Sequence, residues 1–330
     1  MVKNNLFSVL KKILLLDEFS QEDTIHEILK YDFKREVIEN SGSKDSVTLM
    51  KEYKTGKGTE DCDRCNLTLE IYKELGWIIR ACCDEDYVYA QTNIMQGNQR
   101  AFPNVRFDTI NSFSTLYRCA LAVYYPDEFK FVFNNNGVLS VKECASSAYV
   151  SNNRIGDLIN KSKVVEKALP YMQEFFQLTH SIGNFMIVPG YKQPYSNAKA
   201  LCDEIKDFID LFLLKLFTDG EEGKISYKQY NGEEFVVYDC VKNKWRDWLK
   251  ENIELLCLQD YFQMKNVDIK PLPLYEGHSF KCTLPTSKET LKECIEEINK
   301  RIKVRGLRMI MKINNKVEQI CKKMIDSFVY

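Results

Sequence analysis

Apolar residues recur at helical spacing in most long segments of this 330-residue chain, and that pattern constrains the fold more than any other feature. The clearest case is the segment 196–217. Six of its apolar side chains fall on one broad helical face: Ile205, Phe208, Ile209, Phe212, Leu213 and Leu216. Such a face is typical of a helix that packs on a core. Strand-like stretches are few and short, as at 87–92 and 234–238, so the pattern predicts a mainly α fold (α-rich α+β) with minor β elements.

Capping and loop signals predict where other helices begin and end. We expect helices at 66–81, from 108 to about 125, and at 245–264. Asn66 and Asp108 are good N-cap residues for the first two. The segment 39–61 is rich in Gly, Ser, Lys and Thr, which predicts a loop.

The C-terminal sixth of the chain has helix signals of its own. Thr286-x-x-Glu289 is a capping-box pattern that opens a helix, and Arg305-Gly306 is expected to interrupt that helix before a final one. Pro271 and Pro273 mark the best internal boundary. We therefore predict one large helical domain, with residues 1–270 as its main α-rich part and residues 271–330 as a helical hairpin packed on it.

Composition and charge place the chain among soluble globular proteins, with 45% apolar and 28% charged residues. A net charge of −1 gives no overall signal for nucleic-acid or membrane binding. The longest apolar run near the start covers only residues 13–16, which is too short for a signal-peptide core or a membrane span. We expect a cytoplasmic protein without membrane association.

Twelve cysteines in such a protein favour scattered reduced thiols over disulfides. The best metal candidate is the pair Cys62 and Cys65, followed by adjacent Cys82 and Cys83. Adjacent cysteines chelate one tetrahedral ion awkwardly, so a structural zinc ion at Cys62 and Cys65 is the weaker alternative. No cofactor is predicted.

The stretch 178–189 is the first candidate for a functional site, because polar groups precede an apolar run there. His180 could act as a general acid or base, paired with Asp207 or Asp210 from the next helix. Ser181 and Asn184 would bind the ligand. The structural alternative is a histidine at a helix C-terminus that hydrogen-bonds the last carbonyls.

A second polar stretch lies at 107–115. Asp108, Asn111 and Thr115 fall on one face of the expected helix, where a carboxylate and two neutral groups, with Ser112, could orient a polar ligand. The structural alternative is helix capping by Asp108. P-loop, dinucleotide-binding and HExxH zinc motifs are absent from the sequence.

The C-terminal segment is locally basic and could contact phosphate groups of a nucleic acid or an acidic partner. The alternative is a solvated helical face. Nine residues carry the positive charge: Lys300, Arg301, Lys303, Arg305, Arg308, Lys312, Lys316, Lys322 and Lys323.

These motifs resemble a family of uncharacterised bacterial proteins with a domain of unknown function. The family pattern reads T-I-G-N-F-x-x-V-P, then F-N-x-x-R, then D-x-W-D-L-x-L, and it matches residues 179–189, Asn197, and the segment from Asp207 to Leu213. A D-T-M-N-S segment resembles 108–112. The chain departs from the pattern where Lys199 or Ala200 stands in place of the arginine and Ile209 in place of the tryptophan. The resemblance implies site residues, including Asn197 as a ligand donor, and no reaction.

Two functional hypotheses follow. The first is an enzyme or ligand-binding protein that acts on a nucleotide or nucleic acid in a toxin or phage-defence setting. Its catalytic residues would be His180, Asp108 and Asp207, and its ligand-binding residues Asn111, Ser112, Thr115, Ser181, Asn184, Asn197 and Asp210. The second is a non-catalytic interaction or structural module whose motifs are buried turns. The sequence leaves open whether the chain is an enzyme.

Overall fold

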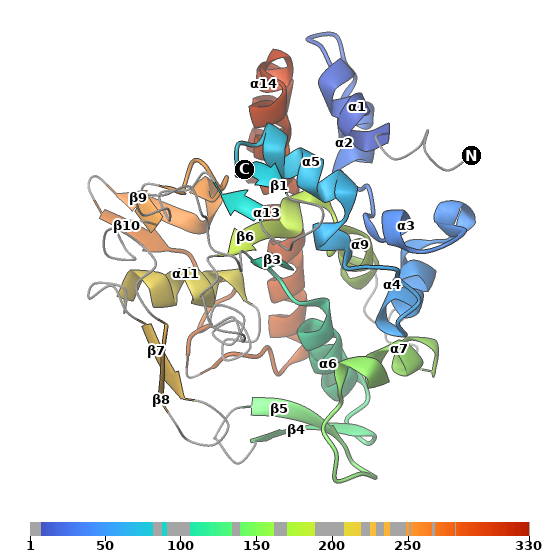
Figure 1. Cartoon of the computed structure of the whole chain (residues 1–330). Coiled ribbons are helices and arrows are strands. Elements are labelled where there is room, and N and C mark those ends of the chain that lie inside the picture. Colours follow the sequence, from blue (N-terminus) through green and yellow to red (C-terminus); the bar gives the residue numbers. More distant parts are fainter. Residues whose placement is uncertain are drawn as a thin grey trace.

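A computed structural model describes residues 8–81, 88–90, 106–133, 139–161, 170–188, 208–218, 225–228, 234–237, 249–250, 252–265, 268–280 and 282–329. The fold is mainly α with minor β elements, as predicted (Figure 1). The helices are α1 (Ser8–Leu15), α2 (Glu22–Leu29), α3 (Lys34–Val37), α4 (Ser46–Lys54), α5 (Asn66–Glu74), α6 (Phe113–Tyr124), α7 (Asn152–Lys161), α9 (Tyr171–Leu178), α11 (Ile209–Thr218), α13 (Lys288–Ile313) and α14 (Glu318–Val329). Short 3-10 turns are η1 (Ser41–Ser43), η2 (Cys62–Arg64), η3 (Ile182–Asn184), η5 (Gln259–Tyr261) and η6 (Asn315–Val317).

The strands in the described residues form separate two-stranded antiparallel pairs. These are β1 (Ile78–Ala81) with β2 (Val88–Ala90), β3 (Arg106–Thr109) with β6 (Phe185–Val188), β4 (Phe129–Phe133) with β5 (Leu139–Glu143), β7 (Ile225–Lys228) with β8 (Glu234–Val237), and β9 (Phe262–Lys265) with β10 (Asp268–Pro271). The pair β3–β6 matters most for the site, because it joins the two polar stretches singled out in the sequence.

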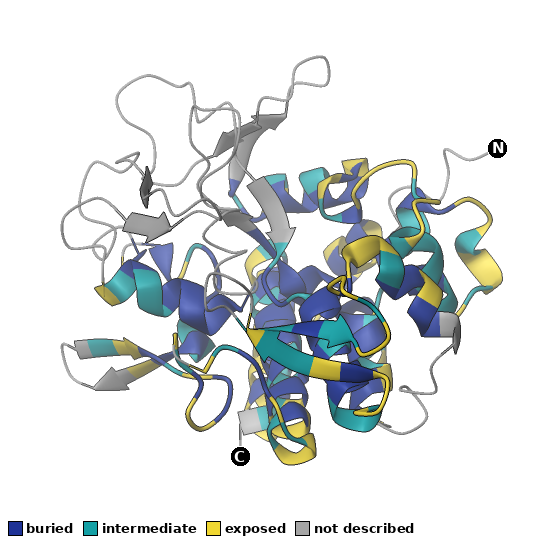
Figure 2. Ribbon diagram, turned by 90° about the horizontal axis from the view of Figure 1, so that it is seen from below, coloured by how far each residue is buried: buried dark blue, intermediate teal, exposed yellow. Residues whose placement is uncertain are grey.

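Helix α13 runs through the middle of the molecule and contacts η3, α9 and α6 (Figure 1). Its inner face is fully buried along its length, from Leu291 through Ile302 to Ile310. In the ribbon of Figure 2, buried residues lie mostly on the helix segments in the interior, and exposed residues lie mostly in described loops and at helix ends. The core is therefore built around one long helix.

Two details predicted for this helix are wrong. The capping box is formed by Ser287 and Thr290, one residue later than the Thr286/Glu289 pattern. The helix also continues without a break through Arg305-Gly306. Gly306 packs closely there against α2, since a Cβ at this position would lie 2.6 Å from Leu29 Cδ2, the tip of a flexible side chain.

The predicted C-terminal hairpin is present, and its turn is η6. Helix α14 folds back along α13, so that Lys303 Nζ lies 4.9 Å from the centre of the Phe328 ring. The division of the chain at residue 271 stays a prediction.

Four local predictions are corrected by the structure. The helix expected at 66–81 ends at Glu74, because Gly76 adopts a left-handed conformation with φ of 70° and the chain continues as β1. Asp108 lies in strand β3, and Ser112 caps the helix that follows. The expected loop 39–61 contains α4, which Asp45 caps. Within 252–265 the chain forms η5 and β9 instead of a continuous helix.

Some predictions fall outside the described residues, among them the first half of the helix expected at 196–217. In the part of the chain that the structure covers, no helix combines the length and apolar character needed to cross a membrane.

Candidate functional site

The turn η3 joins the two polar stretches through a pair of buried amides. Asn111 Nδ2 donates to Asn184 Oδ1 at 3.1 Å, and Asn184 Nδ2 donates to the backbone oxygens of Asn111 at 3.2 Å and Thr179 at 2.7 Å. Both side chains are completely buried. Because these bonds connect parts of the protein to one another, the amides act as internal cross-links.

Helix α13 holds the same turn from its other side. Gly183 touches the helix so closely that a Cβ there would lie 1.9 Å from Ile302 O. Arg305 Nη1 donates to Gly183 O at 2.8 Å and Phe185 O at 2.6 Å, and the rest of its guanidinium donates to Leu256 O. The arginine is fully buried, and its bonds in the described chain go to carbonyl oxygens. It fastens three segments together.

His180 lies just before this turn but faces a different neighbourhood. Its backbone oxygen accepts a hydrogen bond from Phe33 N at 2.9 Å, and its ring packs edge-on against the Tyr53 ring, with centroids 5.1 Å apart. Burial, together with the positive charges of Lys34 and Lys54, holds the pKa of His180 well below its ordinary value of 6.5. The imidazole is therefore neutral near pH 7.

Ser181 is also fixed by the backbone. Its hydroxyl donates to Leu178 O at 2.8 Å, and the residue is fully buried. This bond ties the serine to the last turn of α9.

A buried ion pair lies beside His180. Lys34 Nζ and Asp32 Oδ1 are 2.8 Å apart, and both side chains are almost completely inaccessible to water. Asp32 Oδ1 also accepts from Lys34 N at 3.1 Å. Asp32 Oδ2 and His180 Nδ1 have no hydrogen-bond partner among the described residues, and the 2.8 Å contact of Lys34 Nζ with Asp32 Oδ1 is an ion pair without hydrogen-bond geometry. Such clustered, unsatisfied groups are uncommon in protein interiors.

A surface hollow of about 800 Å³ opens on the outer side of Tyr53. We call it the Tyr53 cleft, and its walls are the end of α4, the loop to residue 61 and the start of α7. Gly156 allows α7 to approach the end of α4, since a Cβ there would lie 2.6 Å from Thr55 Cγ2. The hydroxyl of Tyr53 accepts from Cys62 N at 3.2 Å and donates to Asp61 Oδ1 at 3.4 Å. Tyr53 thus lies between the cleft and the buried His180.

The charge of the Tyr53 cleft is negative. Glu60, Asp61 and Asp157 line it, and Lys54 is the only lining cation among the residues that the structure describes. The ammonium of Lys54 lies 5.8 Å from the centre of the Tyr53 ring. Burial raises the pKa of Tyr53, so its hydroxyl stays protonated. The cleft offers carboxylate acceptors, an aromatic ring and the amides of neighbouring asparagines.

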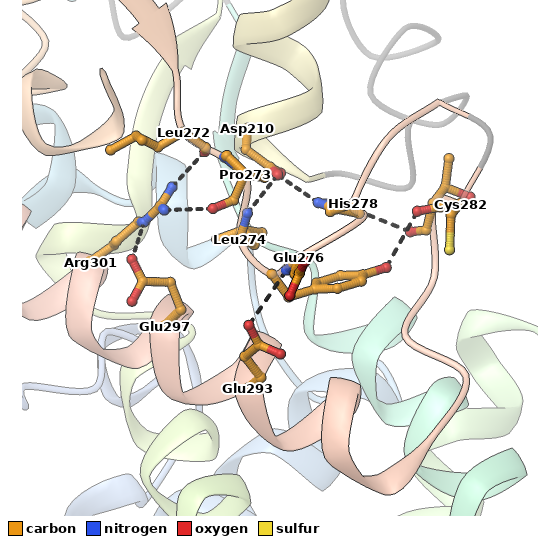
Figure 3. A network of polar contacts seen from close by, with 12 residues as sticks. Asp210, Leu272, Pro273, Leu274, Glu276, His278, Cys282, Glu293, Glu297 and Arg301 are labelled. Carbon is orange, nitrogen blue, oxygen red and sulfur yellow. Dashed lines mark hydrogen bonds and ion pairs between the residues drawn. The ribbon is translucent and has the colours of Figure 1, made fainter. Parts of the chain in front are cut away.

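A second polar cluster pairs Asp210 with His278 instead of with His180 (Figure 3). Asp210 Oδ2 lies 2.5 Å from His278 Nδ1 and accepts from Leu274 N at 2.9 Å. His278 stacks on Tyr275 and meets the edge of Phe208. Both side chains of the pair are buried, so it fastens residues 274–278 to α11.

The remaining predicted site residues lie as follows. Ser112 caps α6 by accepting from Thr115 N, and Thr115 is buried in that helix. Asp108 pairs with Met186 in the β3–β6 register, and its side chain lies outside the described residues. Asn197 and Asp207 also lie outside them. The proposed roles of all these residues stay predictions.

Sequence reasoning missed Lys34, Asp32 and Tyr53. No motif marks them, and Tyr53 belongs to a segment expected to be a loop. Asp32 and Lys34 could have been found only as charges flanking Phe33 in an apolar context, which is a weak signal.

The two cysteines considered for zinc are buried thiols. Burial raises the pKa of Cys62 and of Cys65, which favours the protonated thiol. No group of three His, Cys, Asp or Glu side chains in the described ranges is placed to hold a metal ion. Cys82 and Cys83 lie outside those ranges.

Among the described residues, eight of the nine basic C-terminal side chains have partners. Carboxylates pair with six of them: Lys300 and Arg301 with Glu297, Lys303 with Glu174, Arg308 with Asp260, Lys322 with Glu318, and Lys323 with Glu22. Arg305 and Lys312 donate to backbone oxygens. Much of the positive charge of this segment is therefore neutralised locally.

Comparison with known proteins found no matching family model, curated protein or solved structure. The resemblance to an uncharacterised bacterial family stays a prediction.

The neutral His180 gives a pH prediction. The unfolded chain binds a proton at this histidine near pH 6.5, whereas the folded chain binds it only at lower pH, so acid favours unfolding below about 6.5. We expect the free energy of unfolding to fall between pH 7 and pH 5 by up to about 1.4 kcal/mol per pH unit from this group. Denaturant titrations of wild type and His180→Gln should show a shallower fall for the variant. Coincident slopes would contradict the assignment.

The Asp210–His278 pair gives a second prediction. Asp210→Asn and His278→Gln should each destabilise the protein by about 1.5–3 kcal/mol, because each leaves a buried polar partner unsatisfied. The double variant should lose about 1 kcal/mol less than the sum, since both changes remove one interaction. Urea unfolding of the four proteins measures this coupling. Strict additivity would show that the two side chains act independently.

Proposed function

We propose that this chain is a ligand-binding protein and that the Tyr53 cleft is its site. The observation that supports this most is the position of Tyr53, which separates a polar cleft from a buried cluster with unsatisfied polar atoms. The cleft volume of about 800 Å³ falls within the range of roughly 300–1,000 Å³ that is typical of small-molecule sites.

The charge of the cleft favours neutral or cationic ligands over nucleotides. Among the described lining residues three carboxylates face one lysine; Asp157 also pairs with Arg154 at 3.5 Å, and the negative charge that remains disfavours a phosphate group. The basic C-terminal segment, on which the nucleotide or nucleic-acid hypothesis depended, has most of its cations in ion pairs or hydrogen bonds. Both facts support a ligand without phosphate.

The buried amides support binding without catalysis at the turn η3. Asn111 Nδ2, the Ser181 hydroxyl and the Asn184 amide bond to the protein itself, and only Asn111 Oδ1 among their polar atoms has no partner in the described residues. A ligand that reached them would have to break these internal bonds. We therefore assign these residues to the framework and the Tyr53 cleft to ligand binding.

A thermal-shift screen of neutral, cationic and phosphorylated metabolites tests the proposal. We expect neutral or cationic compounds to raise the unfolding temperature, because ligands that bind only the folded state stabilise it. Asn153→Trp should abolish the shift by filling the cleft from an exposed position. Lys322→Trp, on an exposed position of α14, is the matched control and should keep it.

Two outcomes would reject the proposal. One is a set of ligand shifts that Asn153→Trp leaves unchanged. The other is that only phosphorylated compounds raise the unfolding temperature, and that Lys→Glu changes at residues 300–323 abolish this rise.

A further inference from the structure

Asp32, Lys34 and His180 each have a polar atom that makes no hydrogen bond to the described residues. Asp32 Oδ2 is an acceptor, Lys34 Nζ is a donor, and His180 Nδ1 can be either, depending on the tautomer. All three side chains are more than nine-tenths buried. Leaving such atoms unsatisfied costs about 1–3 kcal/mol each, so a protein keeps them where something else supplies the missing bonds.

These residues lie together, directly behind Tyr53. The bond from Phe33 N to His180 O holds residues 32–34 beside His180. The Tyr53 ring closes the group on the cleft side through its contact with His180. Two hydrogen bonds, of 3.2 and 3.4 Å, fasten its hydroxyl to the loop at residues 61–62. Tyr53 is therefore the side chain that lies between the buried group and the cleft.

The charges of the buried group define the chemistry it can accept. Lys34 and Asp32 neutralise each other, and His180 is uncharged, so a charged ligand group would gain no net attraction there. A hydroxyl group both donates and accepts, and can therefore satisfy the ammonium and the carboxylate at the same time. In the outer cleft, Glu60, Asp61 and Asp157 offer further acceptors for hydroxyl donors.

We propose that Asp32, Lys34 and His180 form an inner subsite of the Tyr53 cleft, gated by Tyr53, that receives a hydroxyl group of a neutral polyhydroxylated ligand. This inference rests on the proposed function of the cleft and specifies its ligand class. Bound water in the same position is the competing explanation, and affinity measurements separate the two.

The test compares D-glucose and myo-inositol with spermidine and ATP by isothermal titration calorimetry on the full chain. We expect at least one polyhydroxylated probe to bind, with its affinity reduced at least 10-fold in Asp32→Asn/Lys34→Met. This pair of changes removes both charges, and the introduced amide keeps the oxygen that accepts from the backbone N of residue 34. Should that variant not fold, His180→Phe preserves the ring contact with Tyr53 and removes the ring nitrogens.

The outcomes separate this inference from the proposed function. Suppose that spermidine or ATP binds to the wild type but not to Asn153→Trp, and that neither polyhydroxylated probe binds. The inner subsite is then rejected, while the Tyr53 cleft remains supported as a binding site. Polyhydroxylated binding that both inner-subsite variants leave unchanged also rejects the subsite, in favour of buried water. If no probe binds at all, the subsite falls, and the metabolite screen decides whether the cleft still stands.

Discussion

Arg305→Met should destabilise the protein by about 3–5 kcal/mol, one of the two largest effects we expect from a single substitution. Methionine fills much of the same space but donates no hydrogen bonds. The carbonyl oxygens of Gly183, Phe185 and Leu256 would lose the donors that satisfy them in the interior. The stacking of the guanidinium over Trp77, 5.4 Å from the ring centre, would be lost as well.

Urea unfolding of Arg305→Met and Arg154→Met measures this effect against a matched control. Arg154 pairs with Glu143 at 2.7 Å, but its side chain is 36% exposed. An exposed pair of this kind contributes about 0–1 kcal/mol. Equal losses in the two variants would show that Arg305 does not fasten the central segments.

Gly183→Ala should have an effect of similar size for a steric reason. The added Cβ would lie 1.9 Å from Ile302 O and 2.9 Å from Ile302 C, and these are backbone atoms of α13 that cannot rotate away. Either the turn η3 or the central helix must move, which would disturb the Arg305 bonds next to it. We expect a loss of at least about 3 kcal/mol.

Two further glycine variants make this comparison quantitative. Gly306→Ala meets the tip of a flexible side chain, Leu29 Cδ2 at 2.6 Å, and should cost less than Gly183→Ala. Gly42→Ala meets no atom of the described residues within 4 Å and should change stability by less than about 1 kcal/mol. If all three variants melted alike in thermal denaturation, the close approach of the turn to α13 would be wrong.

Most of the fold that could be predicted from the sequence came from the helical spacing of apolar residues. It identified the core helices α6 and α11 and the terminal hairpin, because their buried faces follow a local rule. It gave no sign that α13 would pass within contact of Gly183, since that approach depends on tertiary packing. Arg305-Gly306 predicts a helix break by propensity, yet both residues lie inside a helix, where Arg305 makes tertiary hydrogen bonds and Gly306 packs closely on Leu29.

The candidate site was harder to predict for a related reason. His180 was conspicuous as a rare residue in a polar stretch, but its partners Lys34 and Tyr53 lie far away along the chain without a motif. Asp210 found its partner in His278, from a loop with no local signal of its own. The spacing of residues along the chain predicts one helix or strand at a time, whereas these side chains come together only through the packing of several helices and turns.

The central claim is that the turn η3 maintains the fold while the Tyr53 cleft binds the ligand. Thermal unfolding of Asn184→Ala and Asn153→Trp, each with and without a compound that stabilises the wild type, tests it most directly. We predict that Asn184→Ala melts several degrees lower and keeps the ligand-induced shift, and that Asn153→Trp melts near the wild-type temperature and loses it. The reverse pattern, with Asn184→Ala stable but unresponsive and Asn153→Trp fully responsive, would contradict the claim.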